Sequence, residues 1–370
     1  MLGTGYVPSD LTCVRYLLPI IMFACGMTAL RTEHSPQMSS AAIGPPIEIR
    51  IGFDQKSAVN ASLPPSYPET RALLPGMRRS ETRRFVILSD LTDEEVASHG
   101  QLLERTAHAV EAFRVRLGLD VPERRAPQKM LAVAFSRRSD FLDFAYQHDD
   151  IEASWMAGYF SPTTQRLVYF HARDIPSARI AARRIDHLVA MGGDSSDARD
   201  SLNQFVDSST SAVVVHEAVH MILHERGIMP ANSNVPLWLA EGLAAAFEPL
   251  EASQQFGPAR RENGRTKAFR ADLAAGRVPP VAALVASISL PDNGDDSVRR
   301  FYDASAAFSS WLVREEPVAL AEMIRHTLQG KAGASRGERL KVFEKIFGSI
   351  GKLESRWLWN ERQSFEFAVR

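Results

Sequence analysis

Thirteen residues in the second half of the chain, 211–223, limit what this sequence can fold into. They read SAVVVHEAVHMIL, and their only ionisable side chains are His216, Glu217 and His220. The apolar surroundings predict a buried helix. Two histidines and a glutamate are unfavourable inside such a helix unless they are paired or bind a metal. The fold must therefore supply partners or a cation at this point.

The spacing of these residues favours a cation. Residues four apart on a helix differ by about 40° in direction and lie one turn apart. The imidazoles of His216 and His220 can therefore reach one ion from a single face, while Glu217 borders the same site without binding the ion. His-Glu-x-x-His is typical of a zinc hydrolase in which the glutamate is the general base. The alternative is a core helix whose polar side chains have ordinary hydrogen-bond partners.

A second apolar segment offers the missing ligand. A catalytic zinc commonly takes three protein ligands and a water molecule. The sequence after His220 does not continue as the metzincin pattern His-x-x-Gly-x-x-His. Residues 237–248 read LWLAEGLAAAFE and predict another buried helix, in which Glu241 is isolated among apolar neighbours. A lone buried carboxylate near a histidine pair is best explained as the third ligand.

The two segments together resemble the gluzincin metallopeptidases, through His216-Glu-x-x-His220 followed by Trp-x-x-Glu241-Gly-x-Ala. Within that clan the chain is most similar to bacterial families described as peptidase-MA-like, with domains of unknown function. The resemblance covers about residues 83–362 and is specific at the two helices. It implies one catalytic Zn²⁺ bound by His216, His220 and Glu241, with Glu217 as general base.

The resemblance also implies a fold and an activity. The fold is α+β and zincin-like: an N-terminal mixed sheet with helices, then a mainly helical C-terminal subdomain, with the zinc site between them. The activity is hydrolysis of peptide bonds in a peptide or protein substrate by a zinc-activated water. An endopeptidase is favoured, because no amine-binding motif of the aminopeptidase type is visible. The alternatives are an envelope zinc amidase and a catalytically inert zincin-fold binding protein.

Two supporting residues follow from the same resemblance. Aminopeptidase-type gluzincins carry Tyr-x-x-Gly before an apolar helix, and here Tyr302 stands at that position with Ser305 in place of the glycine. Tyr302 is therefore expected to be an oxyanion donor, or else a core tyrosine with an ordinary partner. Some gluzincins orient a zinc histidine with an aspartate four residues past the third ligand, where this chain has alanine. Glu248 and Asp207 are the candidate substitutes.

The N-terminal residues differ from the rest. Fifteen uncharged residues, 16–30, lie between two arginines. This run is short for a membrane span of about 20 residues and suits a signal-peptide core. Residues 1–31 are therefore expected to be a signal peptide or a membrane or lipid anchor, with Cys25 in a loose lipoprotein box; a buried helix is the alternative. Cys13 and Cys25 are the only cysteines. A processed chain would have no thiol, which fits export to the periplasm or cell envelope.

The remaining sequence predicts three further regions. Residues 32–80 form a Pro-rich linker with one possible strand at 47–51. An α/β subdomain spans 81–205, and a helical subdomain carrying the zinc site spans 206–370. Expected strands are 85–89, 129–135, 155–160 and 166–171, and expected helices are 92–117, 138–147, 319–329, 339–347 and 353–365. The last two strands form a hairpin that, by resemblance, presents the edge for an extended peptide.

A few segments give weaker signals. Residues 172–207 predict a helix and then a flexible loop before the zinc helix. Residues 251–275 are basic and predict a surface helix or loop, or a groove that attracts a substrate carboxylate. His171 is expected at a surface strand end, with a position near the metal site as the alternative. His224 is poorly aimed for sharing an ion with His216. The net charge of −1, from 43 basic and 44 acidic residues, argues against nucleic acid as the main partner.

Overall fold

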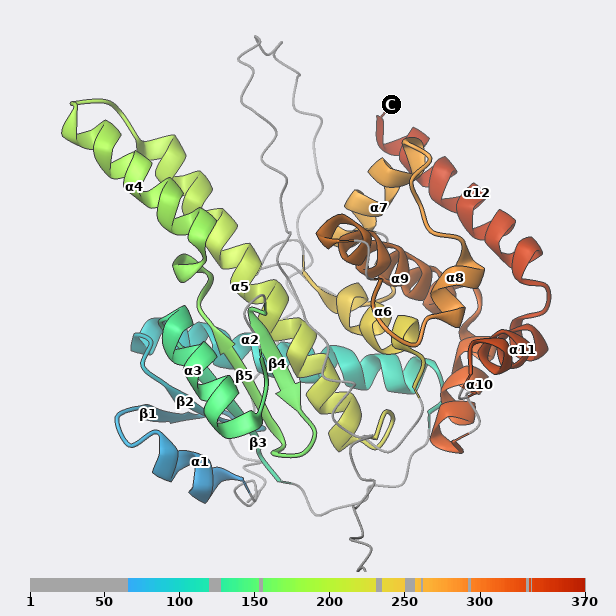
Figure 1. Cartoon of the computed structure of the whole chain (residues 1–370), viewed down its shortest axis with the longest axis horizontal. Helices are drawn as coiled ribbons and strands as arrows, with labels where there is room; N and C mark the ends of the chain where they lie inside the picture. Colours follow the sequence, from blue (N-terminus) through green and yellow to red (C-terminus); the bar gives the residue numbers. More distant parts are fainter. Residues whose placement is uncertain are drawn as a thin grey trace, which may run out of the picture.

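The computed structural model describes residues 66–369, apart from 120–127, 153–155, 231–234, 250–256, 261, 292–293, 331–332 and 334. The expected leader at 1–31 and the possible strand at 47–51 lie outside these residues. The fold is mixed α+β: a five-stranded sheet with its helices comes first along the chain, and helices follow (Figure 1).

The sheet is mixed, as expected. Its strands are β1 (Arg78–Glu81), β2 (Phe85–Ser89), β3 (Met130–Phe135), β4 (Gly158–Ser161) and β5 (Arg166–Phe170), in the spatial order β1-β2-β3-β5-β4. The three inner strands β2, β3 and β5 are parallel, and β1 and β4 are antiparallel edges. The predicted hairpin is confirmed as β4 and β5, with β4 at the sheet edge.

Helices cover the sheet because its inner strands β2 and β3 are buried and apolar on both faces. The helix α2 (Asp93–Arg116) begins at the Thr92–Glu95 capping box and contacts β2. The helix α3 (Arg138–Asp149) packs against β3 and β5. A long helix, α5 (Ser196–Glu225), packs against α2 and against the β4–β5 hairpin. The predicted helices at 92–117 and 138–147 are thereby confirmed within two residues.

The helix α5 is much longer than the sequence predicted. A flexible loop was expected before residue 207, yet α5 runs without interruption for 30 residues. Its first half pairs with α4 (Pro176–Ala190), which follows the short 3₁₀ helix η2 (Ala172–Asp174), and this hairpin projects from the body (Figure 1). A projecting hairpin buries only a narrow apolar stripe, here including Ala178 and Val206. The polar composition of this segment therefore concealed a stable helix.

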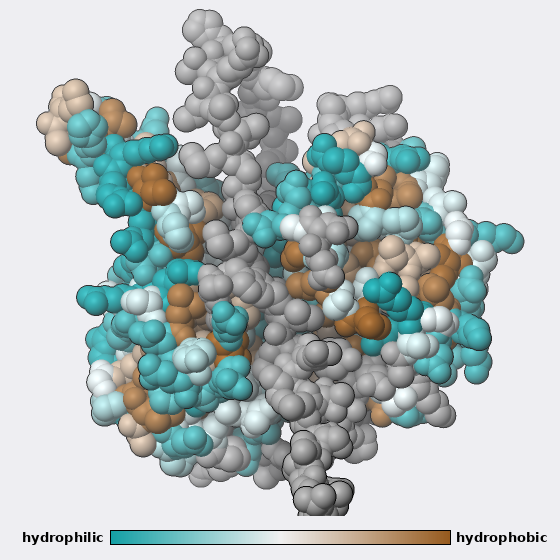
Figure 2. All heavy atoms as spheres, in the orientation of Figure 1, coloured by the Kyte–Doolittle hydropathy of each residue, from teal (hydrophilic) through white to brown (hydrophobic). Residues whose placement is uncertain are grey.

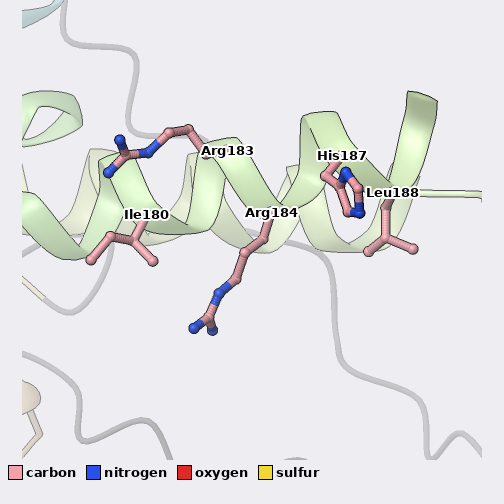
Figure 3. A pocket seen from close by; sticks show the side chains of 5 residues that line it. All are labelled: Ile180, Arg183, Arg184, His187 and Leu188. Carbon is pink, nitrogen blue, oxygen red and sulfur yellow. The ribbon is translucent and has the colours of Figure 1, made fainter. Parts of the chain in front are cut away.

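The outer face of α4 is solvent-exposed and mixed in character. Ile180, Arg184 and Leu188 point to the same side of the helix, beside Arg183 and His187 (Figure 3). Ile180 and Leu188 are 44% and 48% exposed. Hydrophilic and apolar side chains accordingly alternate along the projecting hairpin (Figure 2).

The second half of the chain is helical. Its helices are α6 (Leu237–Phe247), α7 (Gly264–Ala274), α8 (Val281–Ala286), α9 (Asp295–Glu315), α10 (Pro317–Leu328), α11 (Arg336–Phe347) and α12 (Ile350–Val369). The helices α6 and α9 pack along each other, and α5 runs between them and the sheet (Figure 1). The three predicted C-terminal helices correspond to α10, α11 and α12. Within the described residues, no helix combines the length and apolar character that a membrane crossing requires.

One expectation about the linker is wrong. The helix α1 (Tyr67–Leu73) lies inside the segment 32–80 that was expected to be a Pro-rich linker, and the strand β1 begins in that segment and ends at Glu81. Pro68 stands in the first turn of α1, where a missing N–H group is tolerated. Proline content alone therefore did not exclude a helix.

Candidate metal centre

The helix α5 carries the first part of the site. His216 and Glu217 are 0% and 1% exposed, and His220 lies one turn further along at the border of the buried region. The Nε2 atoms of the two histidines are 3.1 Å apart, so both imidazoles point to one place as the helical spacing predicted.

The helix α6 supplies the third candidate ligand, a carboxylate oxygen. The Glu241 Oε2 atom lies 3.3 Å from His216 Nε2 and 3.7 Å from His220 Nε2. For metal–ligand bonds of about 2.0–2.1 Å, a tetrahedral ion separates its ligand atoms by about 3.3 Å. The three observed separations scatter around that value. His216, His220 and Glu241 thus form a group that could hold a metal ion.

The charges around the group also suit a cation. Burial alone would lower the pKa of His216, but contacts with Glu241 and Glu248 outweigh it and raise the pKa to about 9. Burial would likewise raise the pKa of Glu241, but His220 and His216 lower it to about 2. Both shifts show that a positive charge is stabilised at this position, next to the negatively charged carboxylates. With both imidazoles neutral, as metal binding requires, the ionised Glu217, Glu241 and Glu248 and the nearby Arg265 leave two negative charges, which a divalent cation would offset.

Glu248, just past the end of α6, sets the orientation of His216. Its Oε1 atom lies 2.9 Å from His216 Nδ1. A carboxylate can only accept here, so Nδ1 carries a proton; in the neutral imidazole that metal binding requires, Nε2 then presents its lone pair toward His220 and Glu241. This is the partner that metal-binding histidines usually have. Of the two candidates from the sequence, Glu248 therefore has this role; the charges that act on Asp207 are those of Glu95 and Arg173.

Glu217 borders the group without belonging to it. Burial raises the pKa of Glu217 above its usual value, and the smaller effects of His216 and His220, which lower it, do not cancel that rise. The backbone N–H of Phe160 on the edge strand β4 donates to its carboxylate. Its Oε1 atom is buried and has no hydrogen-bond partner. One carboxylate oxygen is therefore held by the sheet edge, and the other is free to accept a proton.

Tyr302 on α9 lies beside the same residues. Its ring centroid is 6.3 Å from that of His216, and its side chain is 3% exposed. Burial and then the negative charge of Glu241 raise the pKa of Tyr302 well above its usual value, so its hydroxyl keeps its proton. A protonated hydroxyl next to the candidate ligand Glu241 can donate a hydrogen bond into the site.

Three sequence-based expectations about other residues have clear outcomes. His224 lies outside the metal-binding group and packs against Phe160, with ring centroids 5.4 Å apart. His171 is not at the surface as expected: it is 7% exposed and stacks on His99 of α2. The basic surface expected at 251–275 is present only in part where it is described: Arg260 and Lys267 are exposed, but Arg265 and Arg270 are buried.

The sequence did not reveal that these two arginines are buried, because their burial depends on carboxylate partners elsewhere in the chain. Arg265 binds Glu248, and Arg270 binds Glu361 on α12. A basic run in a sequence is normally solvated, and carboxylates distant along the chain are what make its burial possible. The sequence contained no local sign of that pairing.

These features define a mixed α+β protein with a buried, three-residue group suited to a divalent cation. A family profile described as "Protein of unknown function (DUF1570)" matches residues 210–331. That span contains the three candidate ligands and also Glu217, Glu248, Arg265 and Tyr302. No curated protein matches the chain.

Proposed function

We propose that this chain is a zinc-dependent peptidase of the gluzincin type, with zinc held by His216, His220 and Glu241. The observation that carries the proposal is the position of Glu217. This buried carboxylate lies beside the candidate ligands without joining them, and one of its oxygens has no partner. A purely structural zinc needs no such base.

The ligand set supports zinc and a catalytic role. Two imidazoles and one carboxylate match the three-ligand sites in which zinc keeps a further position for water or substrate. Structural zinc is usually closed by four ligands. Within the described part of the chain, the group has three members.

The residues around the group can be given roles in amide hydrolysis. When bound, zinc acidifies a water molecule and polarises the substrate carbonyl. Glu217 takes the proton from that water and passes it to the leaving nitrogen, which its raised pKa favours. The Phe160 backbone N–H keeps the carboxylate aimed at the site during this transfer. The Tyr302 hydroxyl donates to the oxygen on which negative charge develops.

The substrate proposed is a peptide or protein bound in an extended form. Within the residues that the structure describes, the strand β4 has one sheet neighbour, β5, and its Phe160 contacts Glu217. An extended chain can add to such an edge through main-chain hydrogen bonds. Because Phe160 on this edge strand donates a hydrogen bond to Glu217, a peptide bound along the edge would pass across the candidate metal site. Cleavage within the peptide chain is favoured, because the sequence shows no amine-binding motif of the aminopeptidase type.

The broader setting remains part of the proposal. The sheet region 81–205 and the helical region 206–370 would act as two subdomains that share the continuous helix α5, with the zinc site between them. Export to the periplasm or cell envelope rests on the sequence of residues 1–31, including Cys25 as a lipid attachment point. An envelope zinc amidase is the rival enzyme, and an inert zincin-fold binding protein is the rival class.

One comparison separates these possibilities. The wild-type chain, loaded with zinc, is expected to cleave a mixed peptide library, while Glu217→Gln keeps zinc and loses cleavage. Glu225→Gln, at the far end of the same helix, is the matched control and should keep both. Cleavage of cell-wall amides alone would favour the amidase. Unchanged turnover in Glu217→Gln would contradict the role given to Glu217.

A further inference from the structure

A buried arginine lies directly behind the residue that orients His216. Arg265, near the start of α7, places Nε 2.9 Å from Glu248 Oε2 and Nη2 3.2 Å from Glu248 Oε1. Both side chains are buried, at 8% and 6% exposure. The two-point geometry fixes the plane of the carboxylate, which a single contact would leave free to rotate.

The arginine is itself held in place. Its Nη1 atom lies 3.4 Å from Asp303 on α9, and Asp303 also binds Arg299 at 2.8 Å. The start of α7 is tied to the end of α6 as well, because Asn263 donates through Nδ2 to the Ala245 carbonyl at 3.0 Å. Arg265 and Glu248 thus occupy fixed positions relative to each other.

We propose that Arg265 is a positioning residue for the metal site and acts on the ligand His216 through Glu248. The inference rests on the metal-binding part of the proposed function and does not require peptidase activity. Glu248 Oε1 accepts hydrogen bonds both from Arg265 and from His216 Nδ1. The arginine therefore determines the position of the oxygen atom that accepts from the imidazole. Without the guanidinium, the carboxylate would be a buried charge with one partner fewer and a free torsion.

The arginine also has a distinct chemical requirement. A guanidinium forms two parallel hydrogen bonds with a carboxylate, whereas a lysine ammonium is a point charge. Arg265→Lys should therefore keep the charge balance and lose the geometry. Arg265→Gln should lose both.

The test is the zinc affinity of the full chain, measured by competition with a chromogenic chelator. Loss of an outer partner of a metal ligand weakens binding by about 10–100-fold. Arg265→Gln is expected at the lower end, about tenfold, and Arg265→Lys between that and the wild type. Arg270→Gln is the matched control, because Arg270 is on the same helix, equally buried and paired with Glu361 at 3.0 Å. It should be less stable yet bind zinc within twofold of the wild type.

A double-mutant cycle identifies the route. In a Glu248→Gln background, Arg265→Gln should cause little further loss, since the residue that transmits its effect is gone. Equal losses for the Arg265 and Arg270 variants, or full additivity with Glu248→Gln, would overturn the inference. If Arg265→Gln does not fold, Arg265→Lys decides the matter in the same cycle.

The outcomes also distinguish the two proposals. A wild-type chain that binds no zinc contradicts both. A chain that binds zinc but shows no effect of Arg265 contradicts only the positioning role. A chain that binds zinc through Arg265 and Glu248 yet cleaves no peptide supports the positioning role and contradicts the peptidase.

Discussion

Gly242 on α6 lies directly against Ser305 on α9: a Cβ atom at residue 242 would come within 2.5 Å of the Ser305 carbonyl oxygen. The absence of a side chain therefore lets the two helix backbones approach closely. The preceding residue is the candidate ligand Glu241, and Tyr302 is one turn from Ser305. The same contact that joins the helices also sets the separation of these two site residues.

Gly242→Ala should consequently be destabilising. The added methyl would meet backbone atoms that cannot move independently, so a loss of about 1–3 kcal/mol in the free energy of unfolding is expected. Zinc affinity should fall too, because α6 must shift. Urea unfolding measures the first effect. Gly351→Ala is the control, since nothing lies within 4 Å of its added Cβ, and it should leave stability unchanged or slightly raised.

The β4–β5 hairpin depends on one buried ion pair. Arg166 lies 2.6 Å from Asp149, with side chains 2% and 0% exposed. Asp149 also accepts from Tyr159 and Thr164 at 2.5 and 3.0 Å. Asp149→Asn would leave Arg166 buried without its counter-charge, so a loss of about 3–5 kcal/mol in the free energy of unfolding is expected.

The comparison for that variant is an exposed pair. Asp186 lies 3.8 Å from Arg199, and their side chains are 75% and 55% exposed. Asp186→Asn should change the stability by less than about 1 kcal/mol. Similar losses for Asp149→Asn and Asp186→Asn in denaturant titrations would mean that the hairpin is held mainly by its apolar contacts.

Two buried histidines should make the fold sensitive to acid. Burial, and to a smaller extent their mutual repulsion and Arg173, lowers the pKa of His99 to about 4, and burial and Arg173 lower that of His171 to about 4. The ordinary value in the unfolded chain is 6.5. Below that pH the unfolded chain binds protons that the folded chain does not, so stability falls as pH drops from 6.5 to about 4.

The expected size is about 2 kcal/mol per histidine by pH 5. Urea unfolding of the wild type at pH 7.5 and pH 5 measures the total. His99→Gln should remove the share due to His99 while keeping an acceptor for the Tyr169 hydroxyl, which lies 2.9 Å from His99 Nδ1. A variant with the same pH dependence as the wild type would show that His99 does not titrate in this way.

Tyr302→Phe tests the proposed oxyanion donor. Loss of one preorganised donor typically lowers kcat by about 10²–10³-fold. Zinc content should not change, because Tyr302 is not among the candidate ligands. Steady-state hydrolysis by zinc-loaded protein gives the answer. Undiminished kcat in a folded variant would leave Tyr302 as a core residue.

The sequence predicted the core of the site because each signal was local. Helical spacing placed His216 and His220 on one face, and the isolation of Glu241 in an apolar helix marked it as a third member. Each conclusion needed only the residues within one or two turns.

What lay beyond prediction depended on pairing across the fold. The sequence left Glu248 and Asp207 as equal candidates, since neither is near His216 along the chain. Arg265 looked like part of a basic surface because its partner Glu248 lies 17 residues earlier. His171 looked exposed because its contact with His99 exists only once α2 covers the sheet. The roles and burial of these residues depend on neighbours that are distant in the sequence, and a local sequence pattern does not identify those neighbours.

The most direct test of the account is the metal content of the purified full chain, by elemental analysis after dialysis. One zinc per chain is expected for the wild type. His220→Ala should lose most of it, and Asp207→Ala, which removes the carboxylate that is not in the site, should retain it. A wild-type chain without zinc after loading, or a His220→Ala chain that binds zinc as tightly as the wild type, would contradict the central claim.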